Sequence, residues 1–415
     1  MRIFVFAEHF PNPYKPYYET QFAQLIDDGH DLRIFTFGKY DEVRNARVAA
    51  YGLAERTTYL PWTLRTVPPR VPGLLRDLLF GPRSVRSSLS LAWDPEQGAK
   101  RNLLDASRIV HLPIDPPDLC LVHDLVTAQY LPFLGRLYPS APVVLYFHGG
   151  ELPHGPPIPE AESLRAFAHL KRVFTNTAFS RDQVVRRGCP AEKVSVCPVG
   201  FRVGDYRPAA SKRYRPGGQL RLLTVGRVSA EKGLDGALEA VKRLRRRGVE
   251  GYRLRIVGAG PSLADLHHRI EVEALGEVVT CCGEMPHHLL LKEYREADAL
   301  LLPSVATDRW AETQACVVQE AMLMKLVVVA SRTGGVQESL APELRRLSFE
   351  ARDVEALSSR LEELLGLPEA ELQRLGEAGR AFAAERYDVR HLNRRLLEQA
   401  LDPRLPLEAE RAAEA

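Results

Sequence analysis

Two cations in a glycine-containing turn are the first residues in this sequence that could do chemistry. The turn spans residues 226–234, with the sequence GRVSAEKGL, and follows the apolar run 220–225. A strand that ends in such a turn and opens a helix lets backbone amides approach an anion. Arg227 can bind a phosphate through two donors, and Lys232 can act as a point charge. The turn therefore predicts an anion site, although a surface loop can also hold an Arg and a Lys.

Two glutamates eight residues apart form a second candidate site. Glu312 precedes a predicted helix, and Glu320 lies about two turns into it among apolar residues. The apolar neighbours indicate that Glu320 is on the interior side of the helix, whereas a single glutamate is more often solvated. Amides near residues 313–316 suit an anion. A third loop, 333–338, follows the next apolar run and can approach the same ligand.

Short apolar runs alternate with longer amphipathic stretches along almost the whole chain. Most runs are apolar on both faces, which is typical of parallel strands covered by helices. The alternation predicts an α/β protein with two doubly wound, Rossmann-like domains that face each other across a cleft. The predicted strands are 2–6, 32–37, 119–123, 143–147, 172–175, 194–198, 220–225, 253–258, 277–282, 298–302 and 326–330.

A polar segment rich in proline and glycine interrupts this alternation after the first six strands. It predicts an interdomain linker over residues 204–218. The domains are then expected at 1–203 and 219–380, with a C-terminal helix and tail at 381–415 that returns to the first domain.

Composition excludes several classes of protein. The chain has 415 residues, 45% hydrophobic and 26% charged, and a net charge of +3 from 56 basic and 53 acidic residues. This balance argues against a nucleic-acid-coating protein. No apolar run approaches the roughly 20 residues that span a bilayer, and the N-terminus indicates a first strand rather than a secretory signal. The six cysteines include no Cys-x-x-Cys pair, so we expect a reducing, cytoplasmic compartment.

The segment 59–93 is not required by a plain two-domain fold. It combines five arginines, among them Arg70, Arg76 and Arg83, with several large apolar side chains. One interpretation is an interfacial helix that contacts a membrane peripherally. The other is a helical insertion packed on the first domain with its arginines in solvent.

Several motifs together resemble the retaining glycosyltransferases of family 4, which have the GT-B fold. In the second half these are the two glutamates after Pro-Ser, the turn described above, Val-Gly-x-Gly-Pro at 257–261, and Gly-Gly-x-x-Glu at 334–338. The first half is similar more loosely, through PDLCLVHD, YFHGGE and the stretch from 176 to 200. The opening FPNPYKPYYETQF resembles the exopolysaccharide branch, and the likeness covers nearly all of residues 1–400.

The resemblance implies roles for individual residues. Arg227 and Lys232 are expected to bind the donor diphosphate, Glu320 the ribose hydroxyls, and Glu312 hydroxyls of the donor sugar. His148 matches the first-domain histidine beside the reacting sugar. The other residues expected to bind the donor are Gly226, Thr313, Gln314, Ala315, Cys316, Gly334 and Gly335.

The roles of the remaining histidines and the departures from the family's sequence pattern also need to be stated. A role for His123 stays open, and His9, His267 and His268 are expected to be structural or at the surface. The family's Gly-Gly loop after the first strand is replaced by KPYYET at 15–20. The usual glycine and proline after the first glutamate are Thr313 and Ala315 here, and those after the second are Lys325 and Val327. Because the charged residues are intact, activity is still expected.

The implied reaction is hexosyl transfer from a nucleotide diphosphate sugar to an acceptor hydroxyl. UDP is favoured over GDP as the carrier, and no metal or other cofactor is expected. Anomeric configuration is retained by front-face attack without a protein nucleophile. The acceptor is expected to be a lipid-linked glycan or a soluble small molecule, and the enzyme is expected to act in the cytoplasm or at the inner face of the membrane. The alternatives are a nucleotide-sugar epimerase of the same fold and a non-catalytic nucleotide-binding protein.

Overall fold

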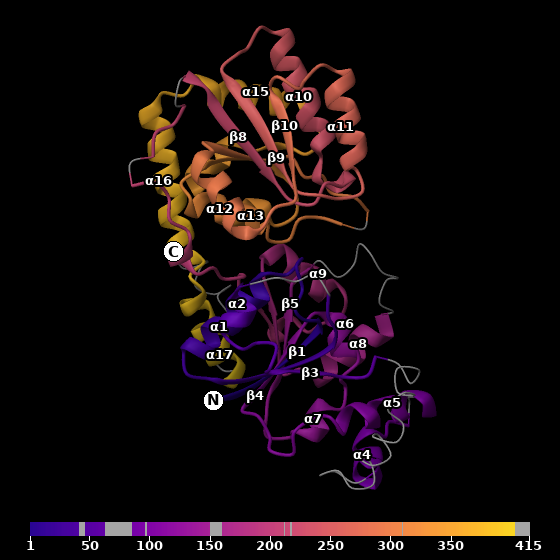
Figure 1. The fold of residues 1–415 in the computed structure, drawn as a ribbon. Coiled ribbons are helices and arrows are strands. Elements are labelled where there is room, and N and C mark those ends of the chain that lie inside the picture. The colour runs from indigo at the N-terminus through magenta and orange to yellow at the C-terminus, as the bar shows by residue number, and fades with distance from the viewer. Residues whose placement is uncertain are drawn as a thin grey trace. The chain divides into compact units, whose positions relative to one another are not determined.

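The computed structural model divides the chain into two compact units (Figure 1). Unit 1 comprises Met1–Phe201 and Val389–Ala415, and unit 2 comprises Arg202–Asp388. The structure describes residues 1–40, 46–62, 85–95, 98–149, 160–210, 212–215, 218–308 and 310–402, without the side chains of residues 85 and 86.

Unit 1 contains a seven-stranded sheet in the order β3-β2-β1-β4-β5-β6-β7, and all of its neighbouring strands are parallel. The strands are β1 (Arg2–His9), β2 (Asp31–Gly38), β3 (Thr57–Tyr59), β4 (Leu119–His123), β5 (Val143–Phe147), β6 (Arg172–Thr175) and β7 (Val194–Val196). The described helices are α1 (Tyr17–Asp27), α2 (Ala46–Ala50), α4 (Val85–Ala92), α5 (Ala99–Ile109), α6 (Leu125–Gln129), α7 (Leu134–Leu137), α8 (Glu160–His169), α9 (Ala178–Arg186) and α17 (Val389–Leu401).

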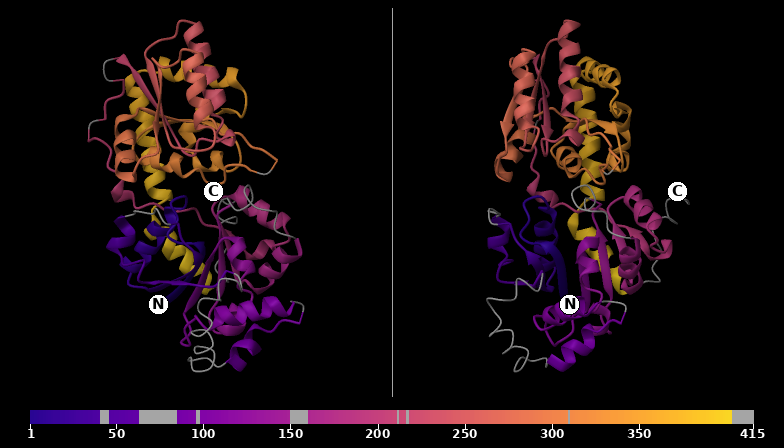
Figure 2. Two further views of the ribbon diagram at one scale, coloured as in Figure 1. Left: turned by 45° about the vertical axis from the view of Figure 1, so that its right-hand side comes forward. Right: turned by 90° about the vertical axis from the view of Figure 1, so that its right-hand side faces the viewer.

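Successive side chains of β1 point to opposite faces of this sheet, and a hydrophobic core lies on each face. Phe4 and Phe6 contribute to a core that includes residues of α5 to α9. Ile3 and Val5 point to the opposite face and pack in a core that includes residues of α1, α2 and α17. Figure 2 shows the C-terminal helix α17 in yellow beside the indigo residues of α1. Both faces of the sheet are covered, so the central strands β4 and β5 are buried along their whole length.

Unit 2 contains a six-stranded sheet in the order β10-β9-β8-β11-β12-β13, again with parallel neighbours. The strands are β8 (Leu220–Val225), β9 (Tyr252–Val257), β10 (Val279–Gly283), β11 (Ala299–Leu302), β12 (Val327–Arg332) and β13 (Phe349–Glu350). The helices are α10 (Leu234–Arg246), α11 (Leu263–Val272), α12 (His287–Glu296), α13 (Cys316–Leu323), α14 (Val336–Ser339), α15 (Val354–Gly366) and α16 (Glu369–Arg386). The predicted doubly wound α/β architecture is confirmed in both units.

The segment expected to be a linker packs on unit 2 instead. Lys212 Nζ donates a hydrogen bond to the carbonyl of Met324 at 3.2 Å, and the Tyr214 hydroxyl donates to the carbonyl of Lys325 at 2.5 Å. Both side chains are buried. Proline and glycine in this segment correctly indicated irregular backbone, but irregular backbone can still pack. The chain therefore passes between the units at residues 201–202 and 388–389 rather than along residues 204–218.

The C-terminal boundary also differs from the expected residue 381. Helix α16 continues to Arg386 within unit 2, and α17 begins at Val389 in unit 1. Leu392 and Leu396 of α17 are buried in the core that also contains residues of α1. Among the described residues, no helix has both the length and the apolar character needed to cross a membrane.

Lys325 occupies a backbone position that favours glycine. It follows the end of α13 with a φ of 60°, in the left-handed region. Its ammonium group lies 2.6 Å from a carboxylate oxygen of Glu377, a half-exposed residue. Lys325, at the position where the resemblance implies a glycine, thus adopts a conformation that is unfavourable for a residue with a Cβ atom.

We expect Lys325→Gly to stabilise the protein by about 1 kcal/mol. The left-handed conformation costs a non-glycine residue about 1–2 kcal/mol, whereas the lost ion pair with the half-exposed Glu377 contributes less than about 1 kcal/mol. Equilibrium unfolding in urea measures the difference. Lys325→Ala removes the ion pair but retains Cβ, so it is the matched control and should not be stabilised. A lower unfolding midpoint for Lys325→Gly than for Lys325→Ala would contradict this account.

Candidate functional site

The turn after β8 is closed by a glycine loop that follows β9. A Cβ atom on Gly258 would lie 1.8 Å from the carbonyl oxygen of Gly226, which no side chain could tolerate. The backbone nitrogen of Val228 donates to the carbonyl of Ala259 at 2.9 Å. The Val-Gly-x-Gly-Pro motif therefore allows two backbone segments to touch, and this contact fixes the turn that carries Arg227. The Arg227 side chain is exposed.

Lys232 lies at the end of a single 3-10 turn, Ala230–Lys232, rather than within the helix that follows. Its Nζ is 2.5 Å from Oε1 of Glu312, and the hydroxyl of Ser304 donates to the same oxygen at 2.8 Å. The ammonium group also lies 4.7 Å from the ring centroid of Trp310. Two residues that the sequence assigned to different parts of a donor are thus in direct contact.

The loop after β12 fixes the backbone of Glu312. The amide of Gly335 donates to the Glu312 carbonyl at 2.9 Å, and a Cβ on Gly334 would lie 1.8 Å from that carbonyl oxygen. The Glu312 side chain is buried. The structure therefore brings together the loop 333–338, Glu312 and Lys232.

The residues between the two glutamates lead into α13. This helix begins at Cys316, and Ala315 is its N-cap residue without a side-chain hydrogen bond. Thr313 and Gln314 precede it, so the amides of 313–316 lie at or before the start of the helix. Burial raises the pKa of the Cys316 thiol, so this cysteine is a neutral neighbour of the two glutamates.

Glu320 is held by two tyrosines that sequence reasoning did not find. The hydroxyl of Tyr206 donates to Oε1 at 3.1 Å, and the hydroxyl of Tyr294 donates to Oε2 at 2.7 Å. Burial raises the pKa of Glu320, while the charge of His287 and the two tyrosine hydrogen bonds oppose this rise. No local signal links these tyrosines to Glu320, because they precede it by 114 and 26 residues.

In unit 1, His148 directly contacts the histidine whose role the sequence left open. Nε2 of His148 lies 2.9 Å from Nδ1 of His123, and the two rings stack with centroids 5.2 Å apart. Burial lowers the pKa of His123 to about 3 and that of His148 well below its ordinary value. Both imidazoles are therefore neutral near pH 7, and one proton is shared between the facing nitrogens.

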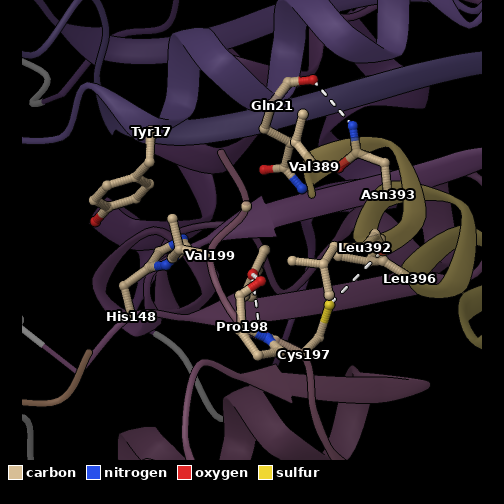
Figure 3. A pocket seen from close by; sticks show the side chains of 12 residues that line it. Tyr17, Gln21, His148, Cys197, Pro198, Val199, Val389, Leu392, Asn393 and Leu396 are labelled. Carbon is tan, nitrogen blue, oxygen red and sulfur yellow. Dashed lines mark hydrogen bonds between the residues drawn. The ribbon is translucent and has the colours of Figure 1, made fainter. Parts of the chain in front are cut away.

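A small cavity adjoins His148, with Tyr17 beside it and side chains of α17 on the opposite side (Figure 3). The hydroxyl of Tyr146 lies 2.9 and 2.7 Å from the carbonyl oxygens of Cys197 and Pro198. The cavity measures about 10 Å³, which suits one water molecule and excludes a sugar. It is therefore part of the support for His148 rather than a substrate site.

Comparison with known proteins decides the class of this site. Residues 207–382, which contain Arg227, Lys232, Glu312 and Glu320, match the model of the family described as Glycosyl transferases group 1. The chain is a glycosyltransferase. The glycosyltransferase is 26% identical over 408 residues to the putative colanic acid biosynthesis glycosyltransferase WcaL of Salmonella typhimurium, covering 95% of this chain and 98% of the relative.

Further relatives and solved structures agree with this assignment. The glycosyltransferase is 26% identical to the amylovoran biosynthesis glycosyltransferase AmsK of Erwinia amylovora, over 86% of this chain and 89% of that protein. Its fold matches Anabaena HepE in complex with UDP, with a TM-score of 0.68 and 15% identity over 96% and 98% of the two chains. A glycosyltransferase from Rickettsia africae gives a TM-score of 0.69 at 15% identity, over 96% and 97%. These structural likenesses establish the GT-B fold.

The contact at Gly334 gives a test of how Glu312 is positioned. We expect Gly334→Ala to destabilise the protein by about 2 kcal/mol or more and to remove most transferase activity, because the new methyl group displaces the Glu312 backbone. Gly248→Ala is the matched control, since Gly248 has a similar φ of 71° and no heavy atom within 4 Å of the added carbon. Urea unfolding and an activity assay compare the two. Equal loss in both variants would show that backbone strain alone, and not the approach to Glu312, limits this position.

Proposed function

We propose that this glycosyltransferase moves a hexose from a UDP-linked donor to an acceptor hydroxyl during exopolysaccharide biosynthesis. The observation that carries the proposal is the contact between Lys232 and Glu312 beside the glycine turn of Arg227. It provides cations for a diphosphate and a carboxylate for sugar hydroxyls at adjoining strand ends. The names of WcaL and AmsK, and the UDP complex of HepE, support the pathway class and the nucleotide.

Departure of the diphosphate is the difficult step of such a transfer. Negative charge grows on the leaving group, and fixed cations close to it lower the barrier because they need no reorganisation. In the proposed complex Arg227 and Lys232 supply this charge. Glu312 already orients Lys232, so part of the conformational entropy of this side chain is lost on folding and not on donor binding.

The transfer is proposed to retain anomeric configuration without a protein nucleophile. In the proposed mechanism the acceptor attacks from the side that the diphosphate leaves, and the leaving phosphate accepts the acceptor's proton. Glu312 then acts as a hydrogen-bond acceptor for sugar hydroxyls, and Glu320 for the ribose. The reaction is proposed to proceed without a metal ion, because Arg227 and Lys232 take the place of a divalent cation at the diphosphate.

The candidate residues of unit 1, His148 among them, are assigned to the acceptor side of the reaction. A neutral His148 beside the sugar does not repel the positive charge that develops on the ring. The acceptor is a lipid-linked glycan or a soluble molecule. A peripheral membrane contact is proposed for 59–93, of which Arg70, Arg76 and Arg83 lie outside the described residues.

The diphosphate assignment is tested by removing each cation. We expect Arg227→Ala and Lys232→Ala each to lower kcat by about 100-fold or more, as is typical for loss of a group that stabilises transition-state charge. Lys292→Ala serves as the control, since that side chain is 68% exposed and pairs only weakly with Glu296 at 3.8 Å. UDP release in the presence of acceptor gives the rates. Activity within about threefold of wild type for both variants would disprove the assignment, and an epimerised donor formed without acceptor would favour the epimerase alternative.

The two glutamates are distinguished by nucleotide binding and its pH dependence. We expect Glu320→Ala to weaken binding of free UDP, and Glu312→Ala to spare it while reducing transfer. Ribose hydroxyls need an ionised Glu320, so UDP affinity should fall as the pH drops through the pKa of this residue. Tyr294→Phe removes a hydrogen bond that lowers this pKa. The loss of affinity should therefore begin at a higher pH than in wild type.

Isothermal titration calorimetry with UDP over a range of pH measures this difference. Tyr252→Phe is the matched control, because its buried hydroxyl donates to the carbonyl of Val241 and not to Glu320. Equal loss of UDP binding in Glu312→Ala and Glu320→Ala would contradict separate roles. An identical pH profile for Tyr294→Phe and wild type would show that the tyrosine does not act through the carboxylate.

A further inference from the structure

An exposed aromatic cluster lies at the carboxyl ends of β1 and β2 in unit 1. It consists of His9, Tyr14, Tyr40 and Trp62, and we refer to these residues as the aromatic edge. The Tyr14 and Tyr40 rings meet edge to face with centroids 5.5 Å apart. The His9 ring lies 5.3 Å from Tyr40 and 6.1 Å from Trp62. The four rings therefore form one continuous set rather than separate surface side chains.

The exposure of these rings is large for a set in mutual contact. Tyr14 is 72% exposed and Tyr40 is 40% exposed. Single exposed aromatic residues are normal on a protein surface and need no explanation. Contiguous aromatic surface with polar groups beside it is typical of ligand-binding sites. The aromatic edge belongs to the second kind, because charged groups adjoin it.

Two carboxylates and a lysine provide those charged groups. Oε1 of Glu8 is 3.8 Å from Nδ1 of His9, and both side chains are about one-third exposed. Nζ of Lys15 lies 3.7 Å from the fully buried Oδ2 of Asp124. Burial and the nearby Asp124 raise the pKa of Glu8, and burial lowers that of His9. The edge thus combines apolar ring faces with hydrogen-bonding groups and lies close to the cation of Lys15.

The backbone around the aromatic edge is fixed before any ligand arrives. The amide of Phe10 donates to the Gly38 carbonyl at 2.9 Å and extends the pairing of β1 with β2. The amide of Tyr14 is bound by the side chain of Asn12 at 3.0 Å. The buried guanidinium of Arg108 donates to the carbonyl oxygens of Pro61 and Trp62. A surface held in this way loses little conformational entropy on binding.

The aromatic edge and His148 share one edge of the same sheet. Strands β1, β2, β4 and β5 are parallel, so their carboxyl ends lie together, and this is where open α/β sheets bind ligands. Contacts lead toward His148 from Lys15, the residue that follows Tyr14 in the sequence. Nζ of Lys15 lies 3.3 Å from the Tyr18 hydroxyl, and the Tyr18 ring is 4.5 Å from His123, the partner of His148.

We propose that the aromatic edge, together with Glu8, binds a saccharide portion of the acceptor. The inference rests on the proposed function, because it names the acceptor class for the same transfer. Sugar rings present apolar C–H faces that pack on aromatic rings, while their hydroxyls need hydrogen-bond acceptors such as the Glu8 carboxylate. The carboxylates disfavour an anionic headgroup. His9, which the sequence suggested was structural or at the surface, is assigned to this binding surface.

Ligand-observed saturation-transfer NMR on the full-length protein with UDP present tests the proposal. The probes are methyl glycosides of common hexoses and deoxyhexoses and a set of disaccharides, with a flat aromatic phenol as the competing class. We expect saturation of sugar C–H protons by wild type. Tyr14→Ala and Tyr40→Ala should each weaken the best probe by about fivefold to tenfold, the range for loss of one ring contact.

Matched variants separate a binding role from a structural one. Tyr40→Phe keeps the ring and should bind within about twofold of wild type, since the loss of one exposed hydroxyl costs little. Tyr59→Ala removes a ring that is 43% exposed on β3 but outside the cluster, and should have no effect. Calorimetric binding of UDP should be unchanged in all four variants.

Three results would overturn the proposal. These are no saturation of any saccharide, preferential binding of the phenol, and equal affinity in Tyr40→Ala and wild type. Each of them leaves the proposed function standing as long as wild type binds UDP and Glu320→Ala binds it more weakly. Failure of wild type to bind UDP would instead contradict the proposed function.

Discussion

The contact between Lys232 and Glu312 depends on backbone segments that approach more closely than side chains allow. The two residues lie on loops that follow neighbouring strands, β8 and β11, and their charged atoms are 2.5 Å apart. The approach is possible because Gly334 leaves room for the Glu312 carbonyl, and Gly258 leaves room for the turn that precedes Lys232. A cation and a carboxylate are thereby held in a partly buried site, where their interaction is stronger than in water.

The two units differ in the charge of their candidate site residues. Unit 2 concentrates charge, with Arg227, Lys232 and two glutamates at one edge of its sheet. Unit 1 instead removes charge from its central histidines, because burial of the stacked pair keeps both imidazoles neutral. For the proposed reaction this division is consistent, since negative charge develops on the diphosphate and positive charge on the sugar ring. A protonated His148 would oppose the second of these changes.

Sequence reasoning found the sheets and the glycine motifs because both have local signatures. Strands such as 119–123 are apolar on both faces, and glycines at fixed offsets report close backbone contacts. It did not find Tyr206 and Tyr294, which contact Glu320 across 114 and 26 residues. It also misjudged residues 204–218, since the packing of Lys212 and Tyr214 depends on partners more than 100 residues away. Contacts of this range leave no periodicity in the chain.

Preorganisation connects the separate parts of the structure. Glu320 already accepts one hydrogen bond on each oxygen, so its rotamer is fixed while further lone pairs can still accept hydroxyl groups. Arg108 fixes the backbone at Trp62 in the same manner, with no need to touch a ligand itself. The side chains of each site therefore lose conformational entropy during folding rather than on ligand binding. It follows that a conservative change in a residue that orients Glu320, such as Tyr294→Phe, should alter affinity and its pH dependence well before it alters the fold.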